Sequence, residues 1–376
     1  MTNRALILAA QTKGTFELKG EGFEAEDIRL MVQALRQLGV EIKETDRGLQ
    51  IRNDLSWRGR QDEVKLFLGN SGTSMRFLTS LVTLRKGKTV LTGKDRMKER
   101  PLKDLVDTLR QVGVEIEYLE KEGFPPIRIK GKGQVSGENI RIRGDLSSQF
   151  ISSILLSACS FSGPMELKIL GEPVSHPYVE LTRHQIASWT EKGTLVAKDR
   201  KIEGDASAAV YWWALGKLHD CHVTVTNVPK DTKQPDARFL SLLEEIPKSS
   251  APDDEFDMNE MPDASLMMMA MAPLLDRPTK ITRIGNLRVK ETDRIEAMAT
   301  ELRKIGSEVA VGKDWIEIKP LKEVPQKKIS IATYDDHRIA MSMAILGTRL
   351  GNLEILDPDC VKKTYPAFWD DLKKFS

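Results

Sequence analysis

The sequence predicts an α/β (α+β) fold of two lobes, each built from three repeats of a helix and strand unit around buried helices. One observation is a kind of helix that is apolar nearly all round and is followed each time by a short segment typical of a strand. A second observation is an amphipathic helix that recurs with almost the same residues. A helix that is apolar on every side is buried, and self-similarity along a chain indicates a repeated structural unit.

The buried helices are expected where small polar residues lead into an apolar run. These runs begin at Thr2, Gly72, Ser147, Asp205, Pro262 and Asp336. A turn and a short strand are expected after each of them, at residues 15–20, 88–93, 165–170, 221–227, 279–284 and 352–357. Thr2 and Asn3 also resemble helix caps, because their side chains can accept hydrogen bonds from free backbone N–H groups.

The amphipathic helices end in a shared phrase: LRQLGVEI from Leu35, LRQVGVEI from Leu109 and LRKIGSEV from Leu302. In each, apolar residues recur at helical spacing and form one stripe. Each helix is expected to end at a glycine, Gly39, Gly113 or Gly306, because glycine readily takes the left-handed conformation that closes a helix. These are expected to be outer helices, each followed by an extended stretch.

The repeated units are unequal, and the third and fourth are expected to be shortened. After their outer helices, around residues 180–189 and 237–246, the paired strands found elsewhere are reduced or absent. The simplest division places residues 11–215 in one lobe and residues 216–376, with the N-terminal segment, in the other. The alternative division forms one lobe from residues 1–10 and 220–376. A repeat solenoid is the competing architecture, but it does not require that every helix of one kind be apolar throughout.

Composition indicates a cytoplasmic protein that binds neither nucleic acid nor membranes. The 376 residues include 57 Lys plus Arg and 55 Asp plus Glu, a net charge of +2, and no block of like charge stands out. Cys159, Cys221 and Cys360 lie far apart and form no disulfide framework. The sequence has no run of about 20 apolar residues and no signal peptide. We expect a monomer.

The starts of the buried helices are the candidate anion sites. The residues that stand there are Asn3, Arg4, Asn70, Gly72, Thr73, Arg76, Ser147, Ser148, Gln149, Asp263, His337 and Arg338. A helix N-terminus has free N–H groups and a partial positive charge, so it attracts phosphates and carboxylates. Helix capping is the simpler interpretation of any one of these residues, but arginine follows the cap in three of the six helices.

Two further motifs carry candidate site residues. In NLRVKETDRIEAM (286–298), Lys290, Glu291 and Arg294 gather at a helix start. Glu291 is a candidate general acid or base held beside cations; a capping arrangement with surface ion pairs is the alternative. In DRMKERPLKDL (95–105), Arg100 precedes a helix-start proline and faces either solvent or a ligand.

Two other motifs argue against nucleotide and metal chemistry. LGNSGTSMRFL (68–78) is rich in glycine before a helix but lacks the GK[ST] ending of a nucleotide-binding loop. HDCH (219–222) has the composition of a metal cluster, but it falls on a turn with no second cluster to complete a ligand set.

Ten motifs together resemble the 5-enolpyruvylshikimate-3-phosphate (EPSP) synthase family, in family order and nearly from end to end. They are NRALILAA, LGNSGTSMRFL, RMKERPL, LSSQF, VSHPY, EGDAS, DMNEMPDAS, NLRVKETDR, TYDDHRIAM and LDPDCVKKTYP. The resemblance implies two lobes of three folding units with the active site between them. It also implies a transferase of the shikimate pathway, which serves aromatic amino-acid biosynthesis and is the target of glyphosate.

The implied reaction moves the enolpyruvyl group of phosphoenolpyruvate to the 5-hydroxyl of shikimate 3-phosphate and releases phosphate, with no metal or organic cofactor. By resemblance, Asp263 takes the hydroxyl proton and Glu291 delivers a proton to the methylene carbon, with His337 as nearby support. The residues implied to bind shikimate 3-phosphate are Arg4, Ser147, Ser148, Gln149, Ser175, Tyr178, Asn286 and Lys290. Those implied to bind phosphoenolpyruvate are Gly72, Arg100, Arg294, Arg338 and Lys363.

The sequence departs from the family pattern in three places. Family members carry a Lys-Ser pair directly before the stretch that matches Thr2 to Arg4, where this sequence has Met1. The third and fourth units are trimmed, and Phe77 replaces a frequent proline. The first departure leaves two alternatives open, an N-terminally truncated member and a non-catalytic relative that binds shikimate 3-phosphate without turnover. The related transferase that acts on a UDP-sugar is disfavoured, because Arg100 occupies the loop where that enzyme relies on a cysteine.

Overall fold

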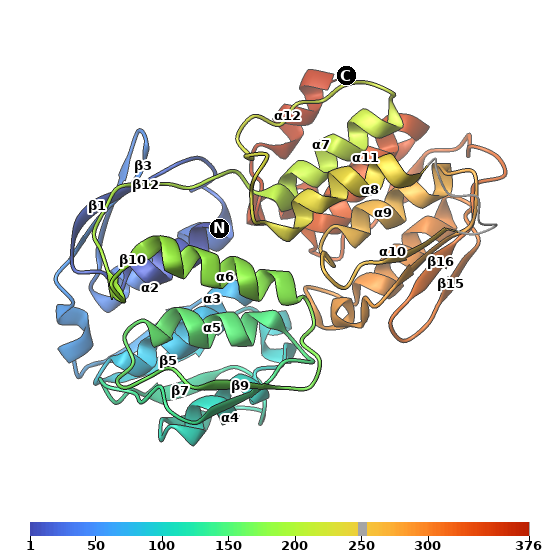
Figure 1. The fold of residues 1–376 in the computed structure, drawn as a ribbon. Helices are drawn as coiled ribbons and strands as arrows, with labels where there is room; N and C mark the ends of the chain where they lie inside the picture. The colour runs from blue at the N-terminus through green and yellow to red at the C-terminus, as the bar shows by residue number, and fades with distance from the viewer. Residues whose placement is uncertain (247–253, 376) are drawn as a thin grey trace. The chain divides into compact units, whose positions relative to one another are not determined.

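The computed structural model describes residues 1–246 and 254–375, which fall into two compact units. The first unit is Met1–Glu203 and the second is Gly204–Ser376 (Figure 1, blue to green and green to red). The expected assignment of the N-terminal segment to the second lobe is corrected, because Ala5–Ala10 lie in the core of the first unit. The division also falls between residues 203 and 204 rather than near residue 215.

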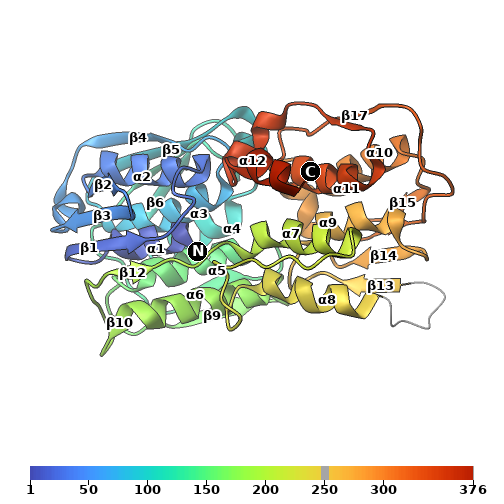
Figure 2. The same ribbon diagram turned by 90° about the horizontal axis from the view of Figure 1, so that it is seen from above.

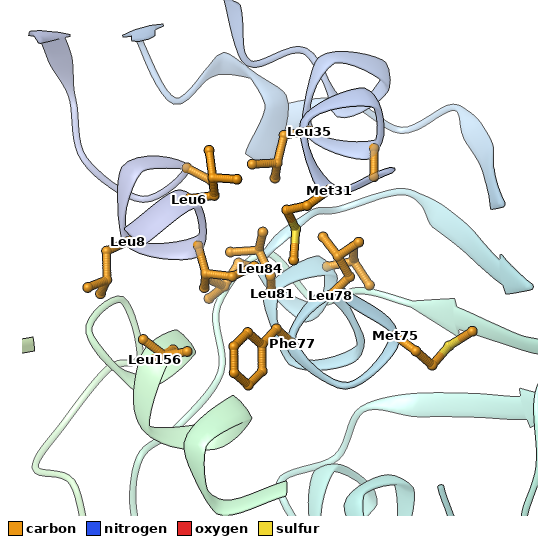
Figure 3. Close-up of a cluster of buried hydrophobic side chains, with 14 of the residues drawn as sticks. Leu6, Leu8, Met31, Leu35, Met75, Phe77, Leu78, Leu81, Leu84 and Leu156 are labelled. Atoms are coloured by element: carbon orange, nitrogen blue, oxygen red, sulfur yellow. The ribbon is translucent and has the colours of Figure 1, made fainter. Parts of the chain in front are cut away.

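Four helices form the centre of the first unit. They are α1 (Thr2–Ala9), α3 (Gly72–Leu81), α5 (Ser148–Ala158) and α6 (His176–Trp189). Helix α1 packs against the other three, and α5 lies between α3 and α6. Side chains of α1, α3 and α5, including Leu6, Phe77 and Leu156, converge in the core with Met31 and Leu35 (Figure 3). The burial of α1, α3 and α5 on nearly all sides is what their apolar sequences predict. Helix α6, expected to be an outer helix, packs on α1 and α5 with one side and exposes the other, including Arg183 and His184.

Two four-stranded sheets and two outer helices complete most of the first unit. One sheet has the order β12 (Arg200–Lys201), β1 (Gly14–Lys19), β3 (Gly48–Asn53) and β2 (Glu41–Thr45). The other has the order β4 (Glu63–Phe67), β5 (Lys88–Thr92), β7 (Ile127–Lys130) and β6 (Glu115–Tyr118). The outer helices are α2 (Glu26–Leu38) and α4 (Lys103–Gln111). Gly39 and Gly113 follow them with φ of 111° and 78°, which confirms the predicted glycine endings.

The second unit has a similar plan. Its buried helices are α7 (Ala206–Leu218), α9 (Ser265–Met271) and α11 (His337–Leu350). Helices α8 (Phe239–Glu245), α10 (Arg294–Lys304) and α12 (Phe368–Leu372) pack around them (Figure 2). One sheet has the order β13 (Asp254–Asp257), β14 (Thr279–Thr282), β16 (Ile316–Ile318) and β15 (Val309–Val311).

Buried helices connect parallel strands in both units. Helix α3 connects β4 to β5, α9 connects β13 to β14, and α11 connects β17 (Ile329–Ile331) to β18 (Leu353–Ile355). Helix α5 likewise connects β8 (Ile140–Arg143) to β9 (Leu167–Leu170). Parallel strands need such a crossover, because a short turn cannot return the chain to the same edge. These four helices therefore begin after strand ends, where loops carry polar residues.

Two local predictions are wrong. Residues 221–227 form no strand, although exposed and half-buried side chains alternate along them as they do in a strand. The reason is that no strand in the described part of the chain pairs with their backbone groups. Thr2 and Asn3 are not caps but lie inside the first turn of α1, whose N-cap is Met1. The expected caps at Ser147, Asp205 and Asp336 are confirmed, since each side chain accepts a hydrogen bond from the backbone N–H two residues on.

Candidate active site

In the second unit, Arg294 gathers three carboxylates. Its Nε donates to Asp336 Oδ2 at 2.7 Å, its Nη1 to Asp263 Oδ1 at 3.1 Å, and its Nη2 to Glu291 Oε2 at 3.0 Å. The arginine is the first residue of α10 and is only 1% exposed. A guanidinium has several donors in a fixed plane, so it can orient several acceptors at once. We call Arg294, Asp263, Glu291, Asp336, Arg338 and Lys363 the second-unit cluster.

The cluster forms where helix starts and the loops before them meet. Asp336 is the N-cap of α11 and accepts from the Arg338 backbone N–H at 2.9 Å, while its carboxylate also binds Arg294. Asp263 lies just ahead of α9, and helices α9, α10 and α11 pack on one another. Capping therefore fixes Asp336 at the point where it can also accept from a neighbouring helix.

Asp263 is ionised at neutral pH in this setting. Its carboxylate accepts from Arg338 Nη2 at 3.1 Å as well as from Arg294, and its side chain is 24% exposed. Burial raises the pKa of Asp263, but Arg338, Lys290 and Arg294 outweigh burial and hold that pKa below the ordinary value of 3.8. An opposite charge within a few ångströms favours the ionised carboxyl.

Glu291 is held from two sides. Lys363 Nζ donates to Glu291 Oε1 at 2.9 Å, and Arg294 binds the other carboxylate oxygen. Lys363 ends the short helix η8 (Pro358–Lys363), and the two side chains are 10% and 7% exposed. The Glu291 carboxyl group is therefore fixed in orientation between two cations.

His337 is neutral at the edge of this cluster. It follows Asp336 at the start of α11 and is 2% exposed. Burial, and then the positive charges of Lys363 and Arg338, lower the pKa of His337 well below 6.5. Asn286 lies in the short helix η7 (Gly285–Val289), and Lys290 is the residue that follows this helix.

In the first unit, two arginines meet at Gly72. Arg100 Nη1 donates to the Asn70 backbone oxygen at 3.0 Å, and Arg76 Nη1 donates to the Gly72 backbone oxygen at 3.2 Å. Both guanidinium groups are nearly buried, at 3% and 4% exposure. A Cβ atom on Gly72 would lie 2.8 Å from Arg100 Cζ and 2.9 Å from Arg76 Nη1. The missing side chain therefore leaves the space that the arginines occupy at the start of α3.

A second group in the first unit surrounds Arg4. Its Nε donates to Thr182 Oγ1 at 2.7 Å, and its guanidinium carbon lies 5.6 Å from the centre of the Phe77 ring. Arg4 Nη2 also reaches the backbone oxygen of Tyr178 at 3.5 Å. Helices α1, α3 and α6 are thereby joined through one cation.

The remaining predicted residues of the first unit lie at helix starts. Ser147 caps α5 and accepts from the Gln149 backbone N–H at 3.3 Å, and Ser148 is the first residue of that helix. The Gln149 side chain reaches Thr73 Oγ1 on α3 at 3.5 Å. Ser175 is the N-cap residue of α6 with a left-handed φ of 55°. The structure thus brings Gln149 to α3 and places the serines at the starts of their helices.

Sequence reasoning did not select two residues that the structure brings into these groups. They are Asp336 and Thr182, whereas Asn70 and Arg76 were among the candidates at a helix start. Asp336 was visible in the sequence as the first residue of a buried helix run. Thr182 lies within α6 and carried no local signal.

The described part of the chain contains neither a metal-binding cluster nor a membrane-spanning helix. Within residues 1–246 and 254–375, no three His, Cys, Asp or Glu side chains are grouped so as to hold a metal ion. No helix in these ranges has the length and apolar character needed to cross a membrane.

Comparison with solved structures defines the class to which the fold belongs. The structure of EPSP synthase from Acinetobacter baumannii superposes with a TM-score of 0.73 at 22% identity, covering 99% of this chain and 92% of that one. The enolpyruvyl transferase NikO from Streptomyces tendae gives a TM-score of 0.67 at 14% identity, covering 99% and 91%. The fold is therefore that of the enolpyruvyl transferases.

Sequence comparison narrows the class to one family. The family model of EPSP synthase (3-phosphoshikimate 1-carboxyvinyltransferase) matches residues 1–372. The 3-phosphoshikimate 1-carboxyvinyltransferase of Haemophilus influenzae (strain PittEE) is 40% identical over 100% of this chain and 94% of its own length. That of Actinobacillus pleuropneumoniae serotype 5b (strain L20) is 38% identical with the same coverage. The chain belongs to the EPSP synthase family.

Proposed function

We propose that the protein transfers the enolpyruvyl group of phosphoenolpyruvate to the 5-hydroxyl of shikimate 3-phosphate and releases phosphate. This is the carboxyvinyl transfer of the shikimate pathway, which leads through chorismate to the aromatic amino acids. The observation that carries the proposal is that Asp263 and Glu291 are hydrogen-bonded to the same guanidinium, that of Arg294. One proton acceptor and one proton donor fixed by one cation suit an addition and elimination that moves two protons.

The two carboxyl groups would act in sequence. Asp263 accepts the proton of the hydroxyl as its oxygen bonds to the central carbon of phosphoenolpyruvate, and Glu291 delivers a proton to the methylene carbon, which becomes a methyl group. Elimination then breaks the bond from the central carbon to the phosphate oxygen. Glu291 takes a proton back from the methyl group as the double bond is restored, and the proton held by Asp263 passes to the departing phosphate. Each proton thus has a named carrier, and we propose that the reaction needs no metal or organic cofactor.

The low pKa of Asp263 is compatible with this role once the substrates bind. The same cations that lower this pKa, Arg338, Lys290 and Arg294, are candidate ligands of the anionic substrates. Negative charges placed beside them would offset their effect on the carboxylate and raise its pKa. The proton affinity of Asp263 would therefore increase when the substrates are in place.

We assign substrate contacts as follows. Shikimate 3-phosphate is held by Arg4, Ser147, Ser148, Gln149, Ser175, Tyr178, Asn286 and Lys290. Phosphoenolpyruvate is held by Gly72, Arg100, Arg294, Arg338 and Lys363, and His337 supports the catalytic pair. Arginines suit these ligands because their planar donors match carboxylate and phosphate oxygens. We also propose that the protein acts as a monomer, which light scattering of the pure protein tests.

The test is phosphate release by the purified protein with both substrates present, together with the mass of the organic product. We expect release that depends on both substrates, inhibition by glyphosate, and loss of activity in Asp263→Asn. Asp257→Asn is the matched control, because that carboxylate is 51% exposed and is paired with Arg283, whose side chain is likewise exposed.

Two outcomes would overturn the proposal. Calorimetric binding of shikimate 3-phosphate without phosphate release would identify a non-catalytic relative. Phosphate release with a UDP-sugar in place of shikimate 3-phosphate would identify the related sugar transferase.

A further inference from the structure

The segment that leads from β17 into α11 has a backbone conformation that its residues rarely adopt. Tyr334 and Asp335 have φ of 57° and 53°. The left-handed region is unfavourable for residues with a Cβ atom, and such a conformation persists only where the surroundings hold it. The segment runs directly into Asp336, the cap of α11 and a member of the second-unit cluster.

Helix α10 holds this segment at both ends. At its first residue, Arg294 binds Asp336. Further along the helix, Glu301 accepts hydrogen bonds from the Tyr334 hydroxyl at 2.6 Å and from the Ala332 backbone N–H at 3.1 Å. Residues 294 and 301 are about two helical turns apart, so their side chains lie on one face of α10.

Glu301 is fully buried, unlike the carboxylates of surface ion pairs. It is 0% exposed, and its third partner is Lys304 Nζ at 2.6 Å. Burial and the neighbouring Glu301 raise the pKa of Tyr334 to about 12, so the hydroxyl stays a hydrogen-bond donor at neutral pH. A buried carboxylate is retained only where its oxygens are well satisfied, and here two of its three partners lie on the segment before α11.

We propose that Glu301 is a positioning residue for the second-unit cluster. By holding the turn at Tyr334 and Asp335 in its left-handed conformation, it sets the direction in which Asp336 and Arg338 enter α11. Without this anchor the turn relaxes, the Asp336 carboxylate leaves Arg294, and Arg338 moves away from Asp263. The link to catalysis rests on the proposed function, whereas the anchoring itself does not.

Two substitutions at residue 301 separate anchoring from general stability. Glu301→Leu keeps the volume but removes both acceptors. Glu301→Gln keeps both contacts, with its amide oxygen accepting from the Ala332 N–H and its NH2 group donating to the Tyr334 hydroxyl oxygen. Glu308→Leu is the matched control, because Glu308 also binds lysines, Lys319 and Lys322, but is 51% exposed.

Hydrogen exchange and steady-state kinetics report on the anchor independently. In Glu301→Leu we expect the backbone amides of residues 332–338 to exchange at least about tenfold faster, because the segment opens locally. We expect kcat to fall about 10- to 100-fold with smaller changes in KM, the effect of displacing catalytic groups by about an ångström. Glu301→Gln restores both quantities to within a few-fold, and Glu308→Leu changes neither.

Unchanged exchange at residues 332–338 in Glu301→Leu would overturn the proposal, as would an equal loss of kcat in Glu301→Gln. If Glu301→Leu does not fold, Tyr334→Phe carries the test, because it removes one hydroxyl from a ring that is 40% exposed. It is then expected to show the same changes to a smaller extent, and wild-type exchange and kinetics would contradict the proposal. If the wild type transfers no enolpyruvyl group, the proposed function fails while the exchange measurement still decides the anchoring.

Discussion

Arg294 and Asp336 are joined by two hydrogen bonds, Nε to Oδ2 at 2.7 Å and Nη2 to Oδ1 at 3.2 Å. Their side chains are 2% and 0% exposed, so water replaces neither bond. The pair connects the first residue of α10 to the cap of α11 and leaves Nη1 for Asp263. One paired contact therefore fixes two helix starts and orients a candidate proton acceptor.

Arg294→Lys is expected to damage both stability and activity. An ammonium cannot donate in the guanidinium's fixed plane, so at least one of the three carboxylates loses its hydrogen bond to residue 294. We expect the free energy of unfolding to fall by about 2 kcal/mol, the scale of a hydrogen bond to a charged group, and kcat/KM to fall about 100-fold or more. Urea denaturation and steady-state kinetics measure the two effects.

Arg283→Lys is the control for this variant. Arg283 binds Asp257 at 3.0 Å with both side chains about half exposed, so the change should alter stability by no more than about 0.5 kcal/mol. Equal effects in the two variants would contradict the importance assigned to the Arg294 geometry.

Gly72→Ala is expected to weaken phosphoenolpyruvate binding. The new methyl group would lie 2.8 Å from Arg100 Cζ and 2.9 Å from Arg76 Nη1, so at least one guanidinium must shift. We expect KM for phosphoenolpyruvate to rise about tenfold, the equivalent of about 1.4 kcal/mol, with a smaller change for shikimate 3-phosphate. Gly59→Ala is the control because its methyl group would meet nothing within 4 Å. An unchanged KM would remove Gly72 and Arg100 from the proposed binding set.

Stability should decline below pH 6.5 because of His337. Its folded-state pKa is lowered well below 6.5 by burial and by Lys363 and Arg338. Below that pH the unfolded chain binds a proton that the folded protein does not, so the free energy of unfolding falls as pH decreases. The slope from this group is at most about 1.4 kcal/mol per pH unit.

Urea denaturation between pH 5 and 7 measures this dependence as the difference between wild type and His337→Gln. The variant should lose that part of the decline, whereas His176→Gln, which alters an imidazole that is 52% exposed, serves as the matched control. Parallel pH profiles for wild type and His337→Gln would contradict the prediction.

Acid should remove a separate contribution from Asp263. Its folded-state pKa is held below 3.8 by Arg338, Lys290 and Arg294, against the opposing effect of burial. The resulting stabilisation is present above the unfolded value and is lost as pH falls from about 4 toward the folded value. The difference in unfolding free energy between wild type and Asp263→Asn should therefore be constant from about pH 5 to 7 and shrink below about pH 4. Circular dichroism with urea at each pH measures it, and a constant difference down to pH 2 would contradict the assignment.

Much of the fold could be predicted from local patterns. The runs at Thr2, Gly72 and Ser147, and those in the second unit, are helices as expected, because a uniformly apolar helix has only the interior to occupy. Predictions from local patterns were wrong where the structure of a segment depends on the elements that pack against it. Residues 221–227 alternate like a strand but have no partner strand in the described chain, and α1 belongs to the first unit because its neighbours there bury it.

The sequence by itself determined which residues stand at helix starts and that arginines and carboxylates are concentrated there. Only the tertiary structure decided which starts meet. Arg294 donates hydrogen bonds to Asp263, which is 31 residues away in the sequence, and to Asp336, which is 42 residues away. The contact of the buried Glu301 with the turn at Tyr334 was likewise invisible in the pattern, since Glu301 reads as a polar residue of an amphipathic helix. Periodicity fixes the face of a helix that is buried, whereas the packing of α9, α10 and α11 fixes which side chains come within hydrogen-bonding distance.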